Sequence, residues 1–396
     1  MAGVPRNILP AESEVVTASD VKIQVDKVYK IFGDRPDEAI AELRAGAHKA
    51  EVLQKTGCVV GLKDIDFSIR RGETFVIMGL SGSGKSTLIR HFNRLIEPTA
   101  GRILVDGRNV MEMTAKELLA FRRNGISMVF QRFGLLPHQT VLENTICGPI
   151  LQGVNRREAV ALGMEQLELV GLKGFEHRFP RQLSGGMQQR VGLARALATR
   201  ADVLLMDEAF SALDPLIKSD MQEQLKDIQA RLKKTIVFIT HDLDEALHLG
   251  DRIAILKDGE LRQVGTGEDI LFRPADDYVE RFVRKVDLSR AMVAHEAFKK
   301  VPVLTEAEAT AERLSALLRE HPGVIVTNGA AFRLLARDSA GEAVPVPSVD
   351  AAAPLGRCFP LLAAGDAILV TENGAATGML TREMAFKALA RSGQAA

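Results

Sequence analysis

The 396-residue sequence has little of three things that would assign it to a particular class of protein. Its three cysteines, Cys58, Cys147 and Cys358, are scattered without the spacing of a metal or redox site. Basic and acidic residues number 51 each, so the basic excess of a nucleic-acid-binding protein is absent. No apolar run approaches the ~20 residues that span a bilayer. We expect a soluble protein of a reducing compartment, without nucleic-acid partners, for which any membrane role must come through a partner.

A glycine-rich stretch with the sequence GLSGSGKST follows an apolar run and opens into a helical pattern. Glycines in such a loop let backbone N–H groups converge on phosphates. Lys85 then reaches the β- and γ-phosphates, and the Ser86 hydroxyl is placed to bind Mg²⁺. The stretch therefore predicts a nucleotide site. The residues assigned to it are Gly79, Ser81, Gly82, Ser83, Gly84, Lys85, Ser86 and Thr87.

A second glycine-rich segment, LSGGMQQR, begins at Leu183 and precedes a strongly helix-forming stretch. The start of a helix offers free N–H groups and a positive dipole end, which makes a second anion site. An apolar strand ending in Asp207 and Glu208 comes next, and this order of motifs resembles an ABC ATPase. In that family the segment closes over nucleotide held by a second copy, which implies a homodimer with composite sites. The residues assigned to this contact are Ser184, Gly185 and Gly186.

The same resemblance assigns roles to further polar residues. Asp207 is expected to hold Mg²⁺ through its water shell, and Glu208 is expected to act as the general base toward the attacking water. Gln131 matches the glutamine that contacts Mg²⁺ or this water. His241 matches the histidine that contacts the γ-phosphate, although a lone histidine is more often structural. Asp214, in a Ser-Ala-Leu-Asp segment, matches a loop at the dimer interface.

Two aromatic residues near the beginning of the chain, Tyr29 and Phe32, are candidates for the ring that stacks on adenine. The ABC pattern favours Phe32, and either ring could instead belong to the hydrophobic core. The motifs together imply ATP and Mg²⁺ as cofactors.

The chain is too long for one ordinary core, which favours two or more domains. We expect an α/β fold: a P-loop ABC-type nucleotide-binding domain with a helical subdomain, then a small α+β domain. Apolar segments without polar alternation fit strands buried on both faces. The predicted boundaries are 1–20 for a flexible tail, 21–286 for the ABC ATPase domain and 287–396 for the small domain.

Two helical regions are predicted inside the ATPase domain. The charged segment 34–56 carries Ile40, Leu43 and Ala47 at helical spacing, which indicates an amphipathic insertion. A helical arm is expected at about 114–172.

Longer segments resemble the ATP-binding subunit of glycine betaine/proline betaine (quaternary amine) ABC importers. The segments that carry this resemblance are 29–33 with the insertion after it, 75–81, 93–99 and 206–217. The resemblance implies uptake of compatible solutes such as glycine betaine, proline betaine or choline, in osmoprotection. It also implies a peripheral position on the cytoplasmic side of the inner membrane, a transmembrane permease as partner, and an extracytoplasmic solute-binding protein as an indirect partner.

Two other functions remain open. The chain could serve an importer for another small solute, such as an amino acid, or be a soluble ABC ATPase of DNA repair or translation. A single phosphate loop and a single LSGG segment favour transport. The apolar stretch 133–142 beside Gln131 also favours transport, since it suits docking of a permease helix, although its side chains could instead pack within the helical arm.

The last hundred residues contain no further catalytic motif. Apolar strands at 324–327 and 367–370, a turn at 372–374, and Thr381 as N-cap of a helix at 382–390 resemble half of a CBS-domain pair. Nucleotide-binding CBS modules usually place an aspartate where this chain has Met384. We therefore expect a degenerate CBS-like regulatory domain, with a docking or dimerising domain that binds no ligand as the alternative.

Overall fold

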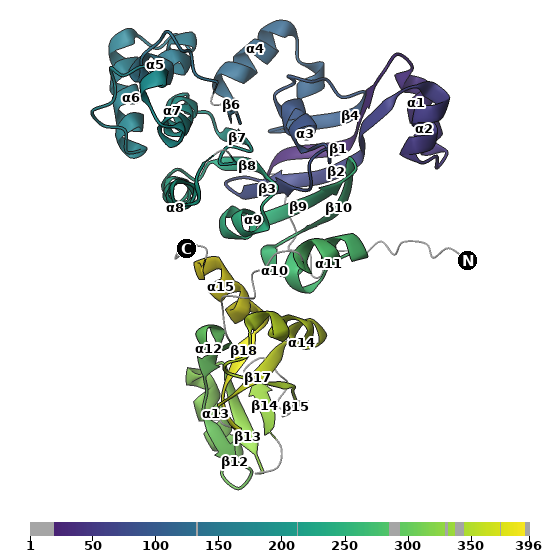
Figure 1. The fold of residues 1–396 in the computed structure, drawn as a ribbon, viewed down its shortest axis with the longest axis vertical. Coiled ribbons are helices and arrows are strands. Elements are labelled where there is room, and N and C mark those ends of the chain that lie inside the picture. Colours follow the sequence, from purple (N-terminus) through teal and green to yellow (C-terminus); the bar gives the residue numbers. More distant parts are fainter. Residues whose placement is uncertain are drawn as a thin grey trace. The chain divides into compact units, whose positions relative to one another are not determined.

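The computed structural model divides the chain into two compact units, Met1–Thr266 and Gly267–Ala396 (Figure 1). It describes residues 20–131, 134–211, 213–284, 294–328, 332–336, 344–372 and 374–392. The tail 1–19 and the predicted domain boundary at 286 lie outside these residues, so both stay predictions. None of the helices described in these ranges is long and apolar enough to cross a membrane.

A six-stranded sheet forms the centre of the first unit, in the order β10-β9-β3-β8-β7-β6. Its strands are β3 (Thr74–Met78), β6 (Ile126–Val129), β7 (Val203–Asp207), β8 (Thr235–Thr240), β9 (Arg252–Lys257) and β10 (Glu260–Gly265). All pairs are parallel except β9 with β10. Every residue of β3, β7 and β8 is buried, as expected for a parallel sheet covered on both faces.

Helices cover this sheet. They are α3 (Lys85–Phe92), α8 (Pro215–Leu232) and α9 (Leu243–Leu249). Both α3 and α9 contact β8, and Figure 1 shows them on opposite faces of the sheet. Each helix follows directly or shortly after a strand, so the loops that join them lie at the carboxyl edge of the sheet.

A second, antiparallel sheet packs against α3 and the parallel sheet. Its strands are β1 (Val21–Phe32), β2 (Val59–Arg70), β4 (Ala100–Val105) and β5 (Arg108–Asn109). The rings of Phe67 on β2 and Phe75 on β3 stack with centroids 5.0 Å apart, and apolar side chains of both sheets form one core.

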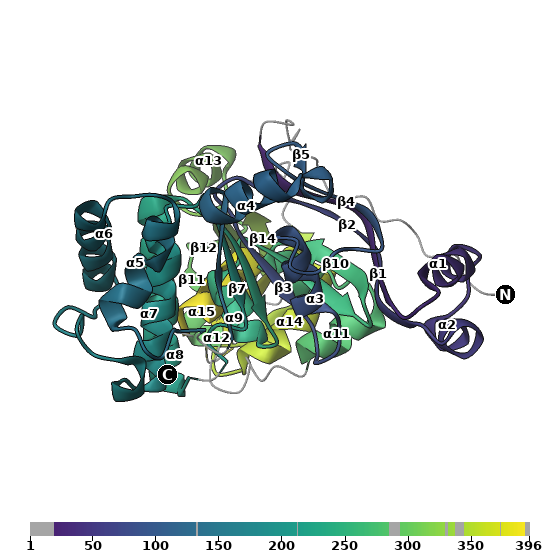
Figure 2. The same ribbon diagram turned by 90° about the horizontal axis from the view of Figure 1, so that it is seen from above.

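The insertion between β1 and β2 folds into two helices, α1 (Pro36–Arg44) and α2 (Lys49–Thr56). Both helices lie within the segment 34–56, and Ala47 lies between them. Ile40 and Leu43 are buried in a small core of their own, separate from the main core. Figure 2 shows this pair of helices at one end of the first unit.

Four helices occupy the predicted arm and its continuation: α4 (Ala115–Asn124), α5 (Val141–Leu151), α6 (Arg156–Leu169) and α7 (Gly185–Ala198). Side-chain oxygens of Thr114, Thr140, Asn155 and Ser184 accept hydrogen bonds from backbone N–H groups in the first turn of these helices. Helices α5, α6 and α7 pack on one another, and Figure 2 shows them at the end of the unit opposite α1 and α2.

The second unit contains two copies of a strand–helix–strand–strand motif. The first copy is β12 (Val303–Thr305), α13 (Ala311–Glu320), β13 (Gly323–Thr327) and β14 (Phe332–Ala336). The second is β16 (Ser348–Asp350), α14 (Cys358–Ala364), β17 (Ala367–Glu372) and β18 (Ala375–Thr381). In each copy the first two strands pair in parallel and the last two form an antiparallel hairpin.

The two copies exchange short strands. The strand before the first copy, β11 (Lys299–Lys300), pairs with β18 of the second, and the strand before the second copy, β15 (Val344–Pro345), pairs with β14 of the first. Side chains of both copies, including Ile325 and Leu369, share one apolar core. The sequence predicted only half of such a pair. Whether the pair is a CBS module stays a prediction.

Four more helices belong to the second unit: α10 (Gly267–Phe272), α11 (Asp277–Arg284), α12 (Ala294–Ala297) and α15 (Arg382–Ser392). Helix α10 contacts α14 and α15, and the rings of Phe272 and Phe359 meet edge to face at 5.5 Å. Thr381 accepts a hydrogen bond from the Met384 N–H at 3.3 Å, which confirms it as the N-cap of the last helix. Asn373 of the predicted turn lies outside the described residues.

Candidate functional site

The glycine-rich loop joins the buried strand β3 to helix α3. Gly79, Gly82 and Gly84 have φ angles of 152°, 80° and 97°, which side chains other than glycine rarely adopt. The Lys85 ammonium is almost fully buried and donates to the backbone carbonyls of Gly79 at 2.8 Å and Leu80 at 3.1 Å. Burial lowers the pKa of Lys85, and the charges of Glu208 and Asp207 oppose that change. The loop therefore holds a cation among its own carbonyl groups.

Two hydroxyls in the loop differ in their partners. The Ser86 Oγ donates to Asp207 Oδ1 at 2.8 Å, while Arg90 of α3 donates to the other carboxylate oxygen at 3.1 Å. The Ser83 Oγ is buried and has no hydrogen-bond partner among the described residues. A buried hydroxyl without a partner is costly, so a ligand that bonds to it would be favoured here.

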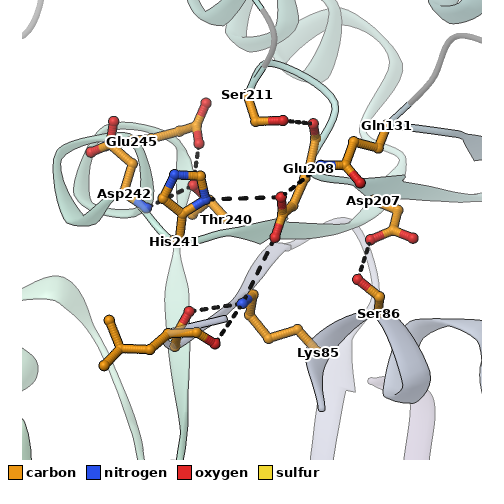
Figure 3. A network of polar contacts seen from close by, with 12 residues as sticks. Lys85, Ser86, Gln131, Asp207, Glu208, Ser211, Thr240, His241, Asp242 and Glu245 are labelled. Atoms are coloured by element: carbon orange, nitrogen blue, oxygen red, sulfur yellow. Dashed lines mark hydrogen bonds and ion pairs between the residues drawn. The ribbon is translucent and has the colours of Figure 1, made fainter. Parts of the chain in front are cut away.

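Glu208 lies at the centre of the predicted catalytic residues, just after β7 ends (Figure 3). Gln131 Nε2 donates to one carboxylate oxygen at 3.0 Å, and His241 Nδ1 is 3.9 Å from the same oxygen. Lys85 Nζ is 3.8 Å from the other oxygen. The segments after β3, β6 and β8 thus bring three predicted residues to the carboxylate of Glu208, which itself follows β7.

The backbone of Glu208 is strained. Its φ angle is 47°, in the left-handed region that non-glycine residues seldom occupy, at a cost of about 1 kcal/mol or more. The Ser211 Oγ donates to the Glu208 carbonyl at 2.9 Å and helps to hold this turn. Such strain is common at functional sites, where it aims a side chain that a relaxed turn would direct elsewhere.

A buried polar cluster next to His241 was not predicted from the sequence. The Thr240 hydroxyl donates to the Glu245 carboxylate, and Gln222 donates to the other oxygen at 3.1 Å. Lys218 pairs with Asp242 at 2.5 Å and lies 3.7 Å from Glu245. Burial raises the pKa of Glu245, and the Lys218 charge opposes that rise. The cluster ties the loop that carries His241 to helix α8.

Residues of the LSGG segment and the Ser-Ala-Leu-Asp segment lie at helix starts. Ser184 Oγ accepts from Met187 N at 3.3 Å, and Asp214 Oδ1 accepts from Ile217 N at 3.1 Å. A Cβ added to Gly186 would lie 2.5 Å from the Ile217 side chain, so this glycine lets α7 approach α8 closely. Among the described residues, no hydrogen bond or ion pair joins the LSGG segment to the groups around Glu208. Ala212 is not described.

The two candidate aromatic rings have different surroundings. Tyr29 is 9% exposed and packs in the small core of the insertion. Phe32, the last residue of β1, is 43% exposed, and the Lys30 ammonium lies 5.1 Å from its ring centroid. Core packing therefore accounts for Tyr29, whereas much of the Phe32 side chain is exposed to solvent. This difference supports Phe32 as the residue that stacks on adenine.

The apolar stretch beside Gln131 is organised by one buried amide. The Asn144 side chain accepts from Leu136 N at 2.7 Å, and its amide nitrogen donates to the Leu136 carbonyl at 3.0 Å. Phe130 is 37% exposed, and Leu135 and Leu136 are half-buried. Phe133 lies outside the described residues. The described part of this loop, from residue 134 on, thus has a backbone held at Leu136 by Asn144 and a partly apolar surface.

Comparisons with known proteins agree with this geometry. The ABC transporter family model matches residues 62–211. Among solved structures, the dimeric bacterial ABC transporter cassette MJ0796 superimposes with a TM-score of 0.53 and 33% identity, covering 62% of this chain and 98% of that one. A second structure of that cassette is a dimer in a post-hydrolysis state with ADP and phosphate bound.

Curated relatives are more similar still. The glycine betaine transport ATP-binding protein OpuAA of Bacillus subtilis is 56% identical over 285 residues, which cover 72% of this chain and 68% of OpuAA. The glycine betaine/proline betaine transport system ATP-binding protein ProV of Escherichia coli is 52% identical over 282 residues, 71% of this chain and 70% of ProV. The chain therefore belongs to the family of ABC transporter ATP-binding proteins that includes these betaine transport subunits.

Proposed function

We propose that this chain hydrolyses ATP as the energy-coupling subunit of an importer for glycine betaine and related quaternary amines, such as proline betaine or choline. The observation that carries the ATPase activity is the Glu208 carboxylate, which Lys85, Gln131 and His241 surround within 3.9 Å. The class of solute rests on the betaine transport relatives, which are 52–56% identical.

The chemistry follows from the positions of these groups. A water molecule held by Glu208 attacks the γ-phosphorus of ATP and transfers a proton to the carboxylate, while the bond to the β–γ bridging oxygen breaks. Lys85 exchanges the carbonyls of Gly79 and Leu80 for phosphate oxygens, and Ser83 Oγ gains a partner. His241 bonds to the γ-phosphate, whose negative charge it helps to hold. ADP and phosphate leave.

The oxygen atoms near the phosphate loop fit Mg²⁺. Ser86 Oγ and Asp207 Oδ1 are 2.8 Å apart, and the Gln131 amide oxygen is a further hard ligand from the same edge of the sheet. Magnesium in nucleotide sites takes few protein oxygens and fills its shell with phosphate and water. When bound, it supplies positive charge that offsets the charge on the phosphates.

The complete site would need a second copy of the chain. The N-terminal turn of α7, with Ser184, Gly185 and Gly186, has the free N–H groups that bind an anion, but no described contact links it to Glu208. The dimeric cassette MJ0796 supports a homodimer in which this turn binds nucleotide on the partner. The nucleotide would then lie between the two copies.

The remaining partners follow from the class of transporter. A transmembrane permease would dock on the fixed, partly apolar loop beside Gln131, so that the subunit lies peripherally at the cytoplasmic face of the inner membrane. A solute-binding protein outside the membrane would select the solute.

The second unit would regulate activity, since every described residue that contacts the Glu208 side chain lies in the first unit.

Reconstitution tests this function. The chain, its permease and the solute-binding protein would be placed in liposomes, and ATP hydrolysis and uptake of radiolabelled glycine betaine would be measured. We expect glycine betaine to stimulate hydrolysis and to be imported, and Lys85→Ala to lower both rates by roughly 10²-fold. Stimulation by an amino acid but not by quaternary amines would support the alternative importer. Hydrolysis that no membrane partner changes would support the soluble ATPase.

A further inference from the structure

The insertion between β1 and β2 brings a lysine to the edge of the phosphate loop. Lys49 is the first residue of α2, and a Cβ added to Gly259 would lie only 2.8 Å from its ammonium nitrogen. The Gly259 N–H in turn donates to the carbonyl of Ser83, in the phosphate loop, at 3.0 Å. A segment far from the nucleotide motifs in sequence thus reaches the loop that binds phosphates.

Three glycines make this approach possible. A Cβ on Gly84 would lie 3.0 Å from the Gly61 carbonyl oxygen and 3.5 Å from the Gly259 Cα. A Cβ on Gly61 would lie 2.7 Å from the Phe32 ring. Gly61 therefore lies between the ring proposed to stack on adenine and the phosphate loop. A nucleotide that stacks on Phe32 and places its phosphates in the phosphate loop must pass over Gly61. Lys49 is adjacent to that path.

Lys49 has no hydrogen bond or ion pair among the described residues, although it is half-buried. The nearby acid Glu260 is already paired with Lys63 at 3.0 Å and with Arg262 at 3.2 Å. Burial lowers the pKa of Lys49, and the charges of Glu260 and Asp258 oppose this. Both carboxylate oxygens of Glu260 are thus paired with other cations, and Lys49 has no carboxylate within ion-pair distance among the described residues.

A second lysine on the same helix, Lys55, has a structural role and serves for comparison. Lys55 is 59% exposed and pairs with Glu42 of α1 at 2.6 Å, which joins the two insertion helices. Lys49 makes no such pair and lies on the side of α2 that faces Gly259. An unpaired, half-buried ammonium is costly unless an anion meets it.

We propose that Lys49 is a nucleotide-binding residue, whose ammonium donates to the α-phosphate of the bound nucleotide. The phosphate that follows the ribose is the first anionic group on the path from Phe32 to the phosphate loop, and it comes before the phosphates assigned to Lys85. The insertion would then be part of the nucleotide site. This inference rests on the proposed ATPase function.

The test compares nucleotide affinities of the full-length chain, measured by calorimetry for ADP and for a non-hydrolysable ATP analogue. Lys49→Gln should weaken both by the same factor of about 10 or more, because a hydrogen bond between charged groups is lost in both complexes. Lys49→Arg should retain most of the affinity. Lys55→Gln is the matched control and should bind as wild type does.

The dependence of nucleotide affinity on salt concentration distinguishes an ionic contact of Lys49 from a role in packing. The affinity of the wild type should fall more steeply with NaCl concentration than that of Lys49→Gln, since salt screens the lost contact. An unchanged affinity in Lys49→Gln, equal salt dependence, or a loss for the ATP analogue alone would overturn the inference. Failure of the wild type to bind, or normal binding by Lys85→Ala, would instead overturn the proposed function.

Discussion

The two units of this chain differ in how their strands end. In the first unit β3, β6, β7 and β8 run parallel, so their carboxyl ends meet at one edge. Glu208 follows β7, and the segments after the other three strands deliver Lys85, Gln131 and His241 to it. In the second unit the strands of each hairpin are antiparallel, so successive strands end at opposite edges. Parallel order collects functional groups from distant segments, whereas hairpins separate them.

The largest effect is expected when the general base, Glu208, is removed from the carboxyl edge of the parallel sheet. Glu208→Gln should lower ATP hydrolysis by roughly 10²–10⁴-fold, because an amide cannot take the proton of the attacking water. Nucleotide binding should persist, and size-exclusion chromatography with ATP and Mg²⁺ should show accumulated dimer. Glu223→Gln is the control, since Glu223 contacts His248 away from the site. Monomer that hydrolyses ATP near the parent rate would refute both the base and the composite site.

A mixing experiment tests whether the site of one copy hydrolyses ATP alone or needs the LSGG segment of a second copy. Lys85→Ala should remove phosphate binding within the same copy, and Ser184→Ala should remove a contact made to the partner's nucleotide, each lowering hydrolysis by roughly 10²-fold. Mixed dimers contain one intact composite site, so mixing the two inactive variants should restore hydrolysis well above either alone. Absence of recovery in dimers shown to be mixed would contradict the model. Gly186→Asp is less suitable, since it would collide with Ile217.

The first unit should lose stability in acid because of one buried histidine. His91 of α3 is fully buried and its Nδ1 lies 2.7 Å from the Ile96 carbonyl oxygen, while burial lowers its pKa from 6.5 to about 4. Its neutral form is favoured in the folded state, so its contribution to stability is present above pH 6.5 and is lost as the pH falls toward 4. At one pH unit below 6.5 the loss is about 1.4 kcal/mol.

Thermal unfolding between pH 7.5 and 5.5 would measure this effect, with the transition that ADP stabilises assigned to the first unit. That transition should shift to lower temperature in acid, and His91→Gln, which keeps a donor for the Ile96 carbonyl, should reduce the shift. An equal shift in the variant would show that other groups cause it.

The smallest effect is expected from removing the second unit. A chain ending at Thr266 should hydrolyse ATP within a few-fold of the full chain. We expect the transporter to respond to ionic strength, as an importer used in osmoprotection would, and the shortened chain should lose most of that response. A regulatory coupling of about 1–3 kcal/mol corresponds to several-fold or larger changes in activity. Hydrolysis across a salt series in liposomes would measure this. Superimposable salt curves would leave the unit a structural role only.

The cut is placed at Thr266 because of packing within the second unit. A chain ending at Arg284 would keep α10 while removing Phe359, which covers Phe272. That longer chain should aggregate more readily than the one ending at Thr266, as light scattering would show. Loss of hydrolysis in a folded chain ending at Thr266 would argue against a purely regulatory second unit.

Motifs with fixed spacing were the most predictable part of the chain. The residues around Glu208 follow apolar strands that the sequence marks clearly, and the structure brings Lys85, Gln131 and His241 to its carboxylate. The cluster of Lys218, Gln222 and Glu245 was missed because its members come from two helices that meet only through packing. The only signal in the sequence was Glu245, an acid four residues after His241, and its burial shows only in the structure.

The second unit was harder because its strands are short. The strands β11 and β15 have two residues each, which is too short for a sequence pattern. They are defined only by their pairing with a neighbouring strand. Helix α10 joins this unit through the ring of Phe359, a partner far along the chain. The insertion was predicted as helical, but the break after Arg44 depends on how both helices fit one small core.

The exchange of β11 and β15 makes the two copies of the motif depend on each other. If either copy were expressed alone, β14 or β18 would lose the strand that covers its outer edge, and an uncovered edge recruits strands from other molecules. Two molecules that each carry a single copy, with the short strand before it, could satisfy this need reciprocally. An ancestral single-motif chain would therefore have had to pair with itself, and duplication would have converted that pairing into an internal one.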